Sequence, residues 1–364
     1  MRSFKIIVAF CVLSLLLSSC GFKDLDRRFF VIAFGIDSGK TKKYEISLKL
    51  AIPSPKIEPG QEKDQVISEE ADSIAEAVRR MKSKVDKEFD FGHCKILVIG
   101  KGFAEKHKLA RENLDWIFRR RDIQQIAYIA LGEPDAKSVL NTKVKSERLP
   151  GNALILALSR EGTESPFIAT VYLFDYYRRV RGYGKDPYLP VIRSLKDTFD
   201  ISRAAVFQTG TIKLELSPEE TSILNQVVRQ YPHISLSTEY NGHQISVNVV
   251  QLKAKYRITG TDENPRIVFH VRMRGETEES SAGVFDKSWT KLEKYLEDQV
   301  VEDYTNFLRK LQQAKVDPIG FGMRYRAIRH EGHGEFDKWW NTVYPNVEFK
   351  VYANVEIRGT GIIK

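Results

Sequence analysis

The tetrapeptide Leu17-Ser18-Ser19-Cys20 constrains this chain most strongly, because it follows a short apolar run that begins beside two basic residues. The apolar run covers residues 6–17, whereas a helix needs about 20 apolar residues to cross a bilayer. A basic start, a short apolar run and small residues together are typical of an export signal that is removed. We therefore expect residues 1–19 to be a signal peptide, and Cys20 to become a first residue that carries a diacylglyceryl group.

Lipid attachment at Cys20 would hold the chain on a membrane without a transmembrane helix. Each buried methylene contributes about 0.8 kcal/mol, and two acyl chains bind stably where one binds only marginally. No long apolar run follows Cys20. An ordinary signal peptide with an incidental cysteine, and an uncleaved anchor, are the alternatives. We expect an exported, polar ectodomain that is tethered by its N-terminus.

Composition places the rest of the chain among ordinary globular proteins. Of 364 residues, 42% are hydrophobic and 29% are charged, and this length suggests two or three domains. The formal charge of +9 suits a nearby anionic membrane surface, although a solvated basic surface is the simpler interpretation. We expect no nucleic-acid partner.

The expected domain boundaries are 20–196 for an N-terminal domain, of one or two parts, and 200–364 for a C-terminal domain.

The N-terminal half alternates between strand and helix patterns, which favours a mixed α/β arrangement. We expect strands at residues 30–37, 44–52, 95–99 and 124–131. We expect helices at residues 74–85 and 102–118, from Pro134 onward, and at 153–160 and 167–180.

The C-terminal half carries sharper signals. Ser217-Pro218-Glu219-Glu220 combines a serine cap, an early proline and a glutamate three residues after the cap, which predicts a helix start. Apolar residues then recur every three or four positions from Trp289 to Ala314. This stripe could form a coiled-coil seam, but its Trp and Tyr favour a helix that covers a sheet. We expect strands at 267–273 and 347–357, and a helix that begins at Asp317-Pro318.

The fold class predicted from these patterns is α+β. We expect a multi-domain, mixed α/β ectodomain, whose C-terminal domain has a largely antiparallel sheet covered by one long amphipathic helix.

Motifs that would carry catalysis or bind a cofactor are weak. His330-Glu331-Gly332-His333 has its histidines at i and i+3, whereas a zinc-protease helix needs i and i+4. Gly100-Lys101-Gly102 lies between a strand and a helix but lacks the third glycine of a dinucleotide loop. We expect no catalytic residue, no cofactor and no metal.

The cysteines also argue against redox or thiol chemistry. Cys11 belongs to the signal peptide and Cys20 to the lipid site, so Cys94 is the one remaining thiol and cannot form an intrachain disulfide. Cys94 lies in an apolar segment, where a small buried hydrophobic residue is the ordinary role.

Two arginine clusters could contact phosphate or lipid headgroups. They are residues 119–121 and residues 178–181, the second beside several tyrosines. Solvated helix ends are the simpler interpretation.

The order of several motifs resembles one family, the C-subunit lipoproteins, Ger(x)C, of spore nutrient-germinant receptors. The resemblance covers nearly all of the chain after Cys20. Its motifs are Asp24, Asp26, Arg27 and Arg28 after the cysteine; Gly35-Ile36-Asp37; Gly92-His93-Cys94-Lys95; Arg119-Arg120-Arg121-Asp122; Ala204-Ala205-Val206-Phe207; Leu216 to Glu220; Asp317 to Gly322; Trp339-Trp340; Tyr344-Pro345; and Ile357 to Gly361.

The resemblance implies a non-enzymatic subunit on the outer face of the spore inner membrane. It would assemble with integral membrane A and B subunits and be required for receptor assembly or signal coupling in germination. The sequence leaves open which germinant is involved and whether this chain contacts it.

Two other functions remain as alternatives. A solute-binding lipoprotein would capture the nutrient directly, and would need a deep cleft with convergent polar groups. An exported hydrolase would need paired carboxylates or a metal, which the sequence does not show at a recognisable spacing.

Overall fold

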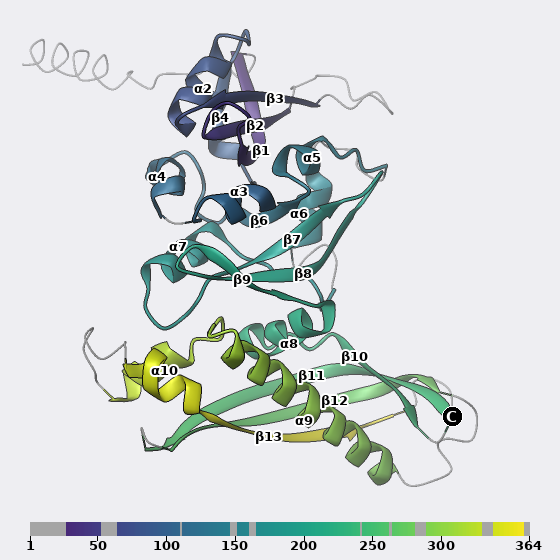
Figure 1. The fold of residues 1–364 in the computed structure, drawn as a ribbon. Helices are drawn as coiled ribbons and strands as arrows, with labels where there is room; N and C mark the ends of the chain where they lie inside the picture. The colour runs from purple at the N-terminus through teal and green to yellow at the C-terminus, as the bar shows by residue number, and fades with distance from the viewer. Residues whose placement is uncertain are drawn as a thin grey trace, which may run out of the picture.

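A computed structural model of the chain describes residues 27–51, 64–109, 111–145, 151–159, 165–240, 242–261, 264–280, 289–329 and 338–359. Within them, two sheets are stacked along the long axis of an elongated molecule (Figure 1). The predicted signal peptide, Cys20 and the segment 330–333 lie outside the described residues. No helix in the described part is long enough and apolar enough to cross a bilayer.

The first sheet has nine strands, with a parallel centre and antiparallel edges. The strands are β1 (Arg28–Ser38), β2 (Tyr44–Ala51), β3 (Asp64–Ala71), β4 (Glu88–Asp90), β5 (Ile96–Gly100), β6 (Tyr128–Glu133), β7 (Tyr188–Ser194), β8 (Phe199–Gln208) and β9 (Thr211–Leu216). The order is β3-β2-β1-β5-β6-β7-β8-β9, and β4 pairs with β1. The four central strands, β1, β5, β6 and β7, are parallel and mostly buried on both faces, as a sheet covered by helices on both sides requires.

Short helices cover this sheet. They are α2 (Ile74–Lys82), α3 (Lys101–Lys106), α4 (Arg111–Arg119), α5 (Ala136–Asn141), α6 (Asn152–Leu158) and α7 (Leu173–Arg181). The pattern of β2 has the predicted alternation, but polar Ser47 and Lys49 are buried as well, because α5 packs against this strand.

Two predicted helices are shorter in the structure. The expected helix 102–118 is divided into α3 and α4, because the main chain at Leu109 turns away to donate to the Gly210 carbonyl oxygen at 2.6 Å. The expected helix 167–180 begins only at Leu173. Before it, the Ile129 N–H donates to the Val171 carbonyl oxygen at 3.0 Å, so this stretch runs extended beside β6.

The second sheet has four strands in the order β10-β11-β12-β13. They are β10 (Ile234–Tyr240), β11 (His243–Gly260), β12 (Pro265–Ser280) and β13 (Glu348–Ile357). The first three are antiparallel to one another, and β13 lies parallel to β12. The predicted fold class, including a largely antiparallel C-terminal sheet covered by a long helix, is confirmed.

The helices of this half are α8 (Pro218–Arg229), α9 (Trp289–Gln313) and α10 (Phe321–Arg329), followed by short turns at Trp339–Val343 and Tyr344–Asn346. The predicted helix start is confirmed, since the Ser217 and Glu220 side chains each accept the other residue's N–H. In Figure 1, α9 lies in front of the sheet, and its stripe from Leu292 to Leu311 is buried. The stripe is therefore the core-facing side of a helix on a sheet, not a coiled-coil seam.

The two sheets share one continuous apolar core. It passes from Phe207 and Leu216 of the first sheet, through Leu224 of α8, to Val247 and Phe269 of the second. Strands β8 and β9 lie after residue 196 yet belong to the first sheet, so this sheet continues across the expected boundary at 196–200. That 20–196 and 200–364 are separate domains stays a prediction.

Candidate functional site

Sequence-predicted residues are placed as follows. Cys20 and the His330–His333 motif lie outside the described residues. Cys94 is buried, as predicted, and its thiol approaches the Ile96 carbonyl oxygen at 3.7 Å. Burial raises the pKa of the Cys94 thiol to about 12, so this group stays protonated near neutral pH.

The loop Gly100-Lys101-Gly102 is held by charged side chains of the protein itself. A Cβ atom on Gly100 would lie 1.9 Å from the Asp37 Oδ1 atom, so only glycine fits there. The Asp37 carboxylate accepts the Ala136 N–H at 2.8 Å, and burial raises the pKa of Asp37 to about 6. The Lys101 ammonium lies 3.0 Å from Glu133 Oε1. These contacts make the loop a structural turn.

The arginine clusters are largely occupied by internal partners. Arg119 pairs with Asp115, and Arg120 pairs with Asp122. Arg120 also lies 4.7 Å from the centre of the Trp116 ring. The cluster at 178–181 likewise bonds to neighbouring side chains, and one of its members is completely enclosed.

Arg179 is that enclosed member, and it lies at the junction between the two sheets. Its side chain is 2% exposed, and its Nε atom donates to Asp175 Oδ2 at 2.8 Å. Its Nη1 atom donates to the carbonyl oxygens of Asp186, at 3.1 Å, and Pro318, at 2.9 Å. The guanidinium also lies 4.6 Å from the centre of the Tyr188 ring. One rigid fork of donors therefore joins α7, the loop before β7 and the loop before α10.

Asp317 anchors the loop that reaches the junction from the second sheet. Its buried carboxylate accepts the N–H groups of Gly320, at 2.7 Å, and Gly322, at 2.8 Å. Burial raises the pKa of Asp317 to about 6. The Tyr344 hydroxyl donates to the Val316 carbonyl oxygen at 2.8 Å, which fixes the other side of the loop. The predicted helix begins later than Asp317-Pro318 because these bonds fold the intervening residues into a compact loop.

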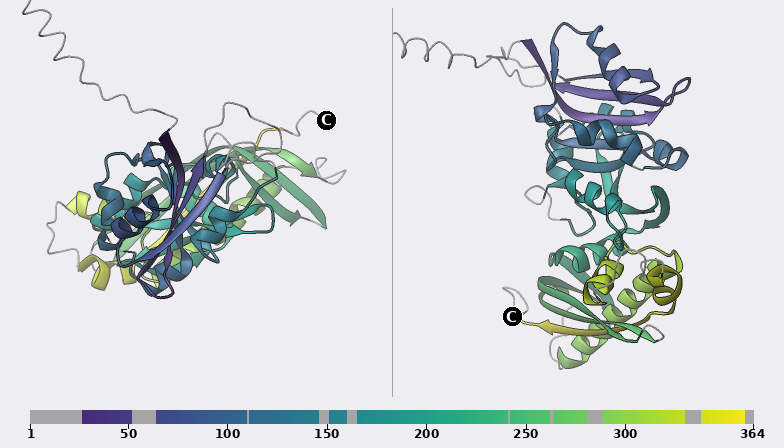
Figure 2. Two further views of the ribbon diagram at one scale, coloured as in Figure 1. Left: turned by 90° about the horizontal axis from the view of Figure 1, so that it is seen from above. Right: turned by 90° about the vertical axis from the view of Figure 1, so that its left-hand side faces the viewer.

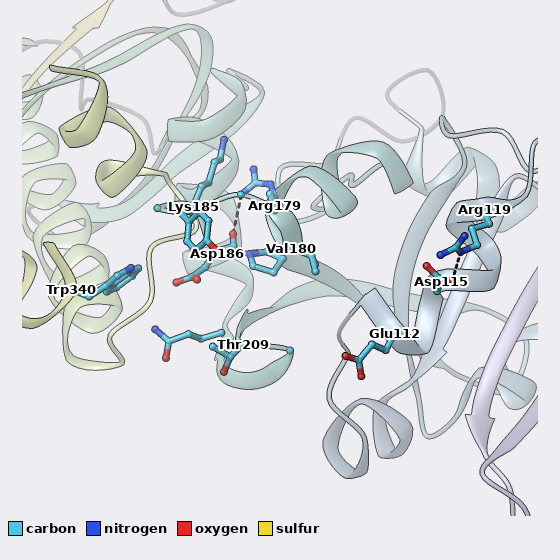
Figure 3. Close-up of a pocket in the computed structure, with 15 residues that line it drawn as sticks. Glu112, Asp115, Arg119, Arg179, Val180, Lys185, Asp186, Thr209 and Trp340 are labelled. Carbon is cyan, nitrogen blue, oxygen red and sulfur yellow. Dashed lines mark hydrogen bonds and ion pairs between the residues drawn. The ribbon is translucent and has the colours of Figure 1, made fainter. Parts of the chain in front are cut away.

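A groove of about 980 Å³ runs beside this junction (Figure 3). Arg179, Lys185 and Asp186 line it from the first sheet, and Trp340 lines it from the second. Lys185 makes no hydrogen bond or ion pair with any described residue. Burial, together with the nearby Arg179 charge, lowers the pKa of Lys185 to about 8. A small anion in this groove could meet that ammonium group.

Sequence reasoning did not anticipate this junction. In the sequence Arg179 belongs to a basic cluster and Asp317 begins a predicted helix, so neither pattern indicates that Arg179 bonds to Pro318, the residue after Asp317. The available signal is helical spacing, because Arg179 lies three positions after Tyr176 and six after Leu173, the other buried residues of α7. Among the described residues, no three His, Cys, Asp or Glu side chains lie close enough together to hold a metal ion.

Comparisons with known proteins agree across both halves of the chain. The family model described as "Spore germination protein N-terminal domain" matches residues 21–194. The model described as "Spore germination B3/ GerAC like, C-terminal" matches residues 202–361. The second model begins inside β8, so the boundary between the two family models falls within the first sheet.

Individual relatives share little sequence identity with this chain but match it over most of its length. Spore germination protein KC of Bacillus subtilis (strain 168) is 20% identical, over 93% of this chain and 91% of that protein. YfkR of the same strain, also named for spore germination, is 22% identical over 80% of this chain and 77% of its own length.

A solved structure shares the fold. The crystal structure of the GerBC protein matches with a TM-score of 0.60 and 17% identity, over 89% of this chain and 96% of that one. The two family models together cover nearly all of the chain after residue 20, and the fold agrees over the same length. The chain belongs to the GerAC-like family of spore germination proteins, the Ger(x)C family.

Proposed function

We propose that this protein is the lipid-anchored, non-enzymatic C subunit of a spore nutrient-germinant receptor. Cys20 provides the attachment, and the two-sheet ectodomain provides surfaces for the integral membrane A and B subunits. The protein acts on the outer face of the spore inner membrane, and receptor assembly or signal coupling depends on it.

The observation that carries this proposal is the junction around Arg179. Buried polar bonds and a continuous core join the two sheets into one elongated body, which suits a scaffold that holds partners at fixed positions. Charged groups beside the groove, such as Arg119 and Asp115, are already paired with each other. This pairing leaves few groups for substrate chemistry among the described residues.

The test is co-purification from spore membranes, with mass spectrometry of the N-terminus and of the associated proteins. We expect diacylglyceryl Cys20 together with two integral membrane proteins. The variant Cys20→Ala should fold normally but lose membrane attachment, receptor assembly and germination. The variant Cys94→Ala is the matched control, because it removes the other cysteine of the exported chain. Normal germination with unlipidated protein at native abundance would reject the proposal.

A solute-binding lipoprotein is the second candidate, and the groove beside Lys185 is the observation that favours it. It predicts saturable binding of a small anionic or zwitterionic nutrient by the purified protein, measured by calorimetry. Binding should disappear in Lys185→Met. Absence of binding across nutrient classes would remove this candidate and leave the scaffold role unaffected.

A further inference from the structure

One face of the second sheet is covered by helices, and no segment that the structure describes covers the other, which we call the open face. Residues of the covered face, such as Ile267, Phe269 and Val271, are buried, while the residues between them on β12 are largely exposed. The exposed side chains at the centre of this open face are basic. We call this set the basic face; its members are Lys253, Lys255, Arg257, Arg272 and Arg274.

Strand pairing places these cations next to one another. Lys253 lies directly opposite Arg272, and Lys255 follows Lys253 two residues later on the same face of β11. Like charges at directly opposite positions of a sheet destabilise it. The arrangement therefore indicates a counter-charge that comes from outside the sheet.

Among the described residues, an acid supplies that counter-charge to one member of the basic face and to no other. Arg274 pairs with Glu356 at 2.8 Å. The side chains of Lys253, Lys255, Arg257 and Arg272 make no hydrogen bond or ion pair with any residue that the structure describes. Four neighbouring cations thus remain available to an anionic partner.

Two hollows lie on the basic face, of about 260 and 490 Å³. Arg272 and Arg274 border both of them. Tyr352 borders the first and stacks on His270, with ring centres 5.4 Å apart. Arginine forks match the oxygens of phosphate esters, and an exposed tyrosine suits the polar region of a bilayer.

The position of the basic face fits a membrane better than an acidic protein segment. In the right-hand view of Figure 2, β1 begins on the side of the molecule opposite α9. The open face of the second sheet points toward this same side, because the buried stripe of α9 covers the other face. The chain between Cys20 and Arg28 can reach at most about 28 Å, so a lipid on Cys20 would keep this side near the bilayer. The cations are spread over a broad sheet surface, which suits many equivalent headgroups.

We propose that the basic face docks on the anionic phospholipid headgroups of the membrane that holds the lipid anchor, so that the molecule lies along the bilayer. This inference rests on the proposed attachment for its orientation. The chemistry recognised is the phosphodiester of an anionic lipid, and the basic face supplies a second, electrostatic contact beside the acyl chains.

The test uses the leader-free chain, residues 20–364, with Cys20→Ser, so that no lipid contributes. Sedimentation is measured with vesicles of phosphatidylcholine alone and of phosphatidylcholine mixed with phosphatidylglycerol. We expect binding to the mixed vesicles only, and its loss at high salt. The triple variant Lys253→Gln, Lys255→Gln, Arg272→Gln should raise the half-saturating lipid concentration at least about ten-fold.

The matched control is the triple variant Lys82→Gln, Lys106→Gln, Lys213→Gln, which removes the same charge from exposed positions around the first sheet. It should bind as the parent does. Equal loss in both triple variants would overturn the proposal, because net charge alone would explain it. Absence of binding to the mixed vesicles would also overturn the proposal. In that case, loss of partner proteins from the basic-face variant on co-purification would identify an acidic protein segment as the ligand of the basic face instead. The assay contains no Cys20 lipid, so its outcome is independent of whether the anchor exists.

Discussion

Asp186 and Asp317, from the two halves of the chain, hold each other by reciprocal hydrogen bonds. The Asp186 N–H donates to the Asp317 carbonyl oxygen at 2.8 Å, and the Asp317 N–H donates to Asp186 Oδ2 at 2.8 Å. Gly184 adds a third bond, since its carbonyl oxygen accepts the Met323 N–H at 2.8 Å. The junction is therefore specified by main-chain geometry as well as by Arg179, and its strength can be measured.

Replacing Arg179 should weaken the junction more than replacing its neighbour. In Arg179→Lys the ammonium cannot reach Asp175 and two carbonyl oxygens together, so we expect the free energy of unfolding to fall by about 2–4 kcal/mol. Arg178→Lys is the control, because Arg178 bonds to the same Asp175 but is 70% exposed, and should change stability by less than about 0.5 kcal/mol. Urea unfolding measures both. Equal effects would contradict the role given to Arg179.

Gly184 should tolerate no side chain. Its φ of +83° disfavours other residues, and a Cβ atom would lie 2.4 Å from the Met323 main-chain nitrogen. Gly242 has a similar φ, of +78°, with no atom near the Cβ position. We expect Gly242→Ala to cost about 1 kcal/mol, from the backbone conformation alone, and Gly184→Ala to cost at least about 2 kcal/mol more. Thermal unfolding of the two variants gives the comparison, and similar losses would mean that the close contact can relax.

The Asp186 carboxyl should make stability depend on pH in an unusual direction. Burial raises the pKa of Asp186 to about 7, well above the ordinary value of about 3.9. Between about pH 4 and pH 7 the folded chain therefore binds more protons than the unfolded chain, so this group lowers the free energy of unfolding as the pH rises.

The neutral variant Asp186→Asn isolates this contribution. Relative to the parent, it should gain about 1–2 kcal/mol of stability between pH 5 and pH 8, because only the parent has to bury a charge at the higher pH. Asp298→Asn, on an exposed part of α9, should show no such change. A constant difference between Asp186→Asn and the parent across this range would show that Asp186 does not titrate there.

The Cys94 thiol should be protected in the folded protein. Because burial raises its pKa to about 12, we expect little reaction with a thiol reagent near pH 8 until the chain unfolds. The test is mass spectrometry of labelled, leader-free Cys20→Ser protein, with and without urea. Rapid labelling in the native state would place Cys94 at an accessible surface.

Two glutamates of α9 protect the open edge of the second sheet. Glu297 Oε1 accepts the Val355 N–H at 3.2 Å, and Glu293 Oε1 accepts the Ile357 N–H at 2.9 Å, so the edge strand β13 has these donors satisfied. Unpaired strand edges promote association. We expect the double variant Glu293→Ala, Glu297→Ala to lose about 1–3 kcal/mol and to form oligomers in light scattering. Glu302→Ala, on the same helix, should remain like the parent.

Local patterns predicted many elements of this fold. The reciprocal bonds at Ser217 and Glu220 lie within three residues of each other, and the stripe of α9 repeats along one helix, so both could be recognised from spacing. The prediction of one helix at 102–118 is wrong at Leu109, because the contact that decides the main-chain path there is with a residue far away in the sequence. A distant carbonyl, that of Gly210, takes its N–H, and propensity along the segment contains no information about that partner.

The sequence alone determined many of the elements, the α+β class and the family resemblance, because helix caps, apolar periods and ordered motifs depend on residues close together in the chain. Only the tertiary structure decided what surrounds each charge. Arg178 and Arg179 are adjacent and identical, yet one is exposed and the other bonds to Pro318 across the junction. Lys253 and Arg272 face each other on an open sheet without an acid between them. Burial and electrostatic pairing are set by contacts between distant segments, so the junction and the basic face became visible only in the folded chain.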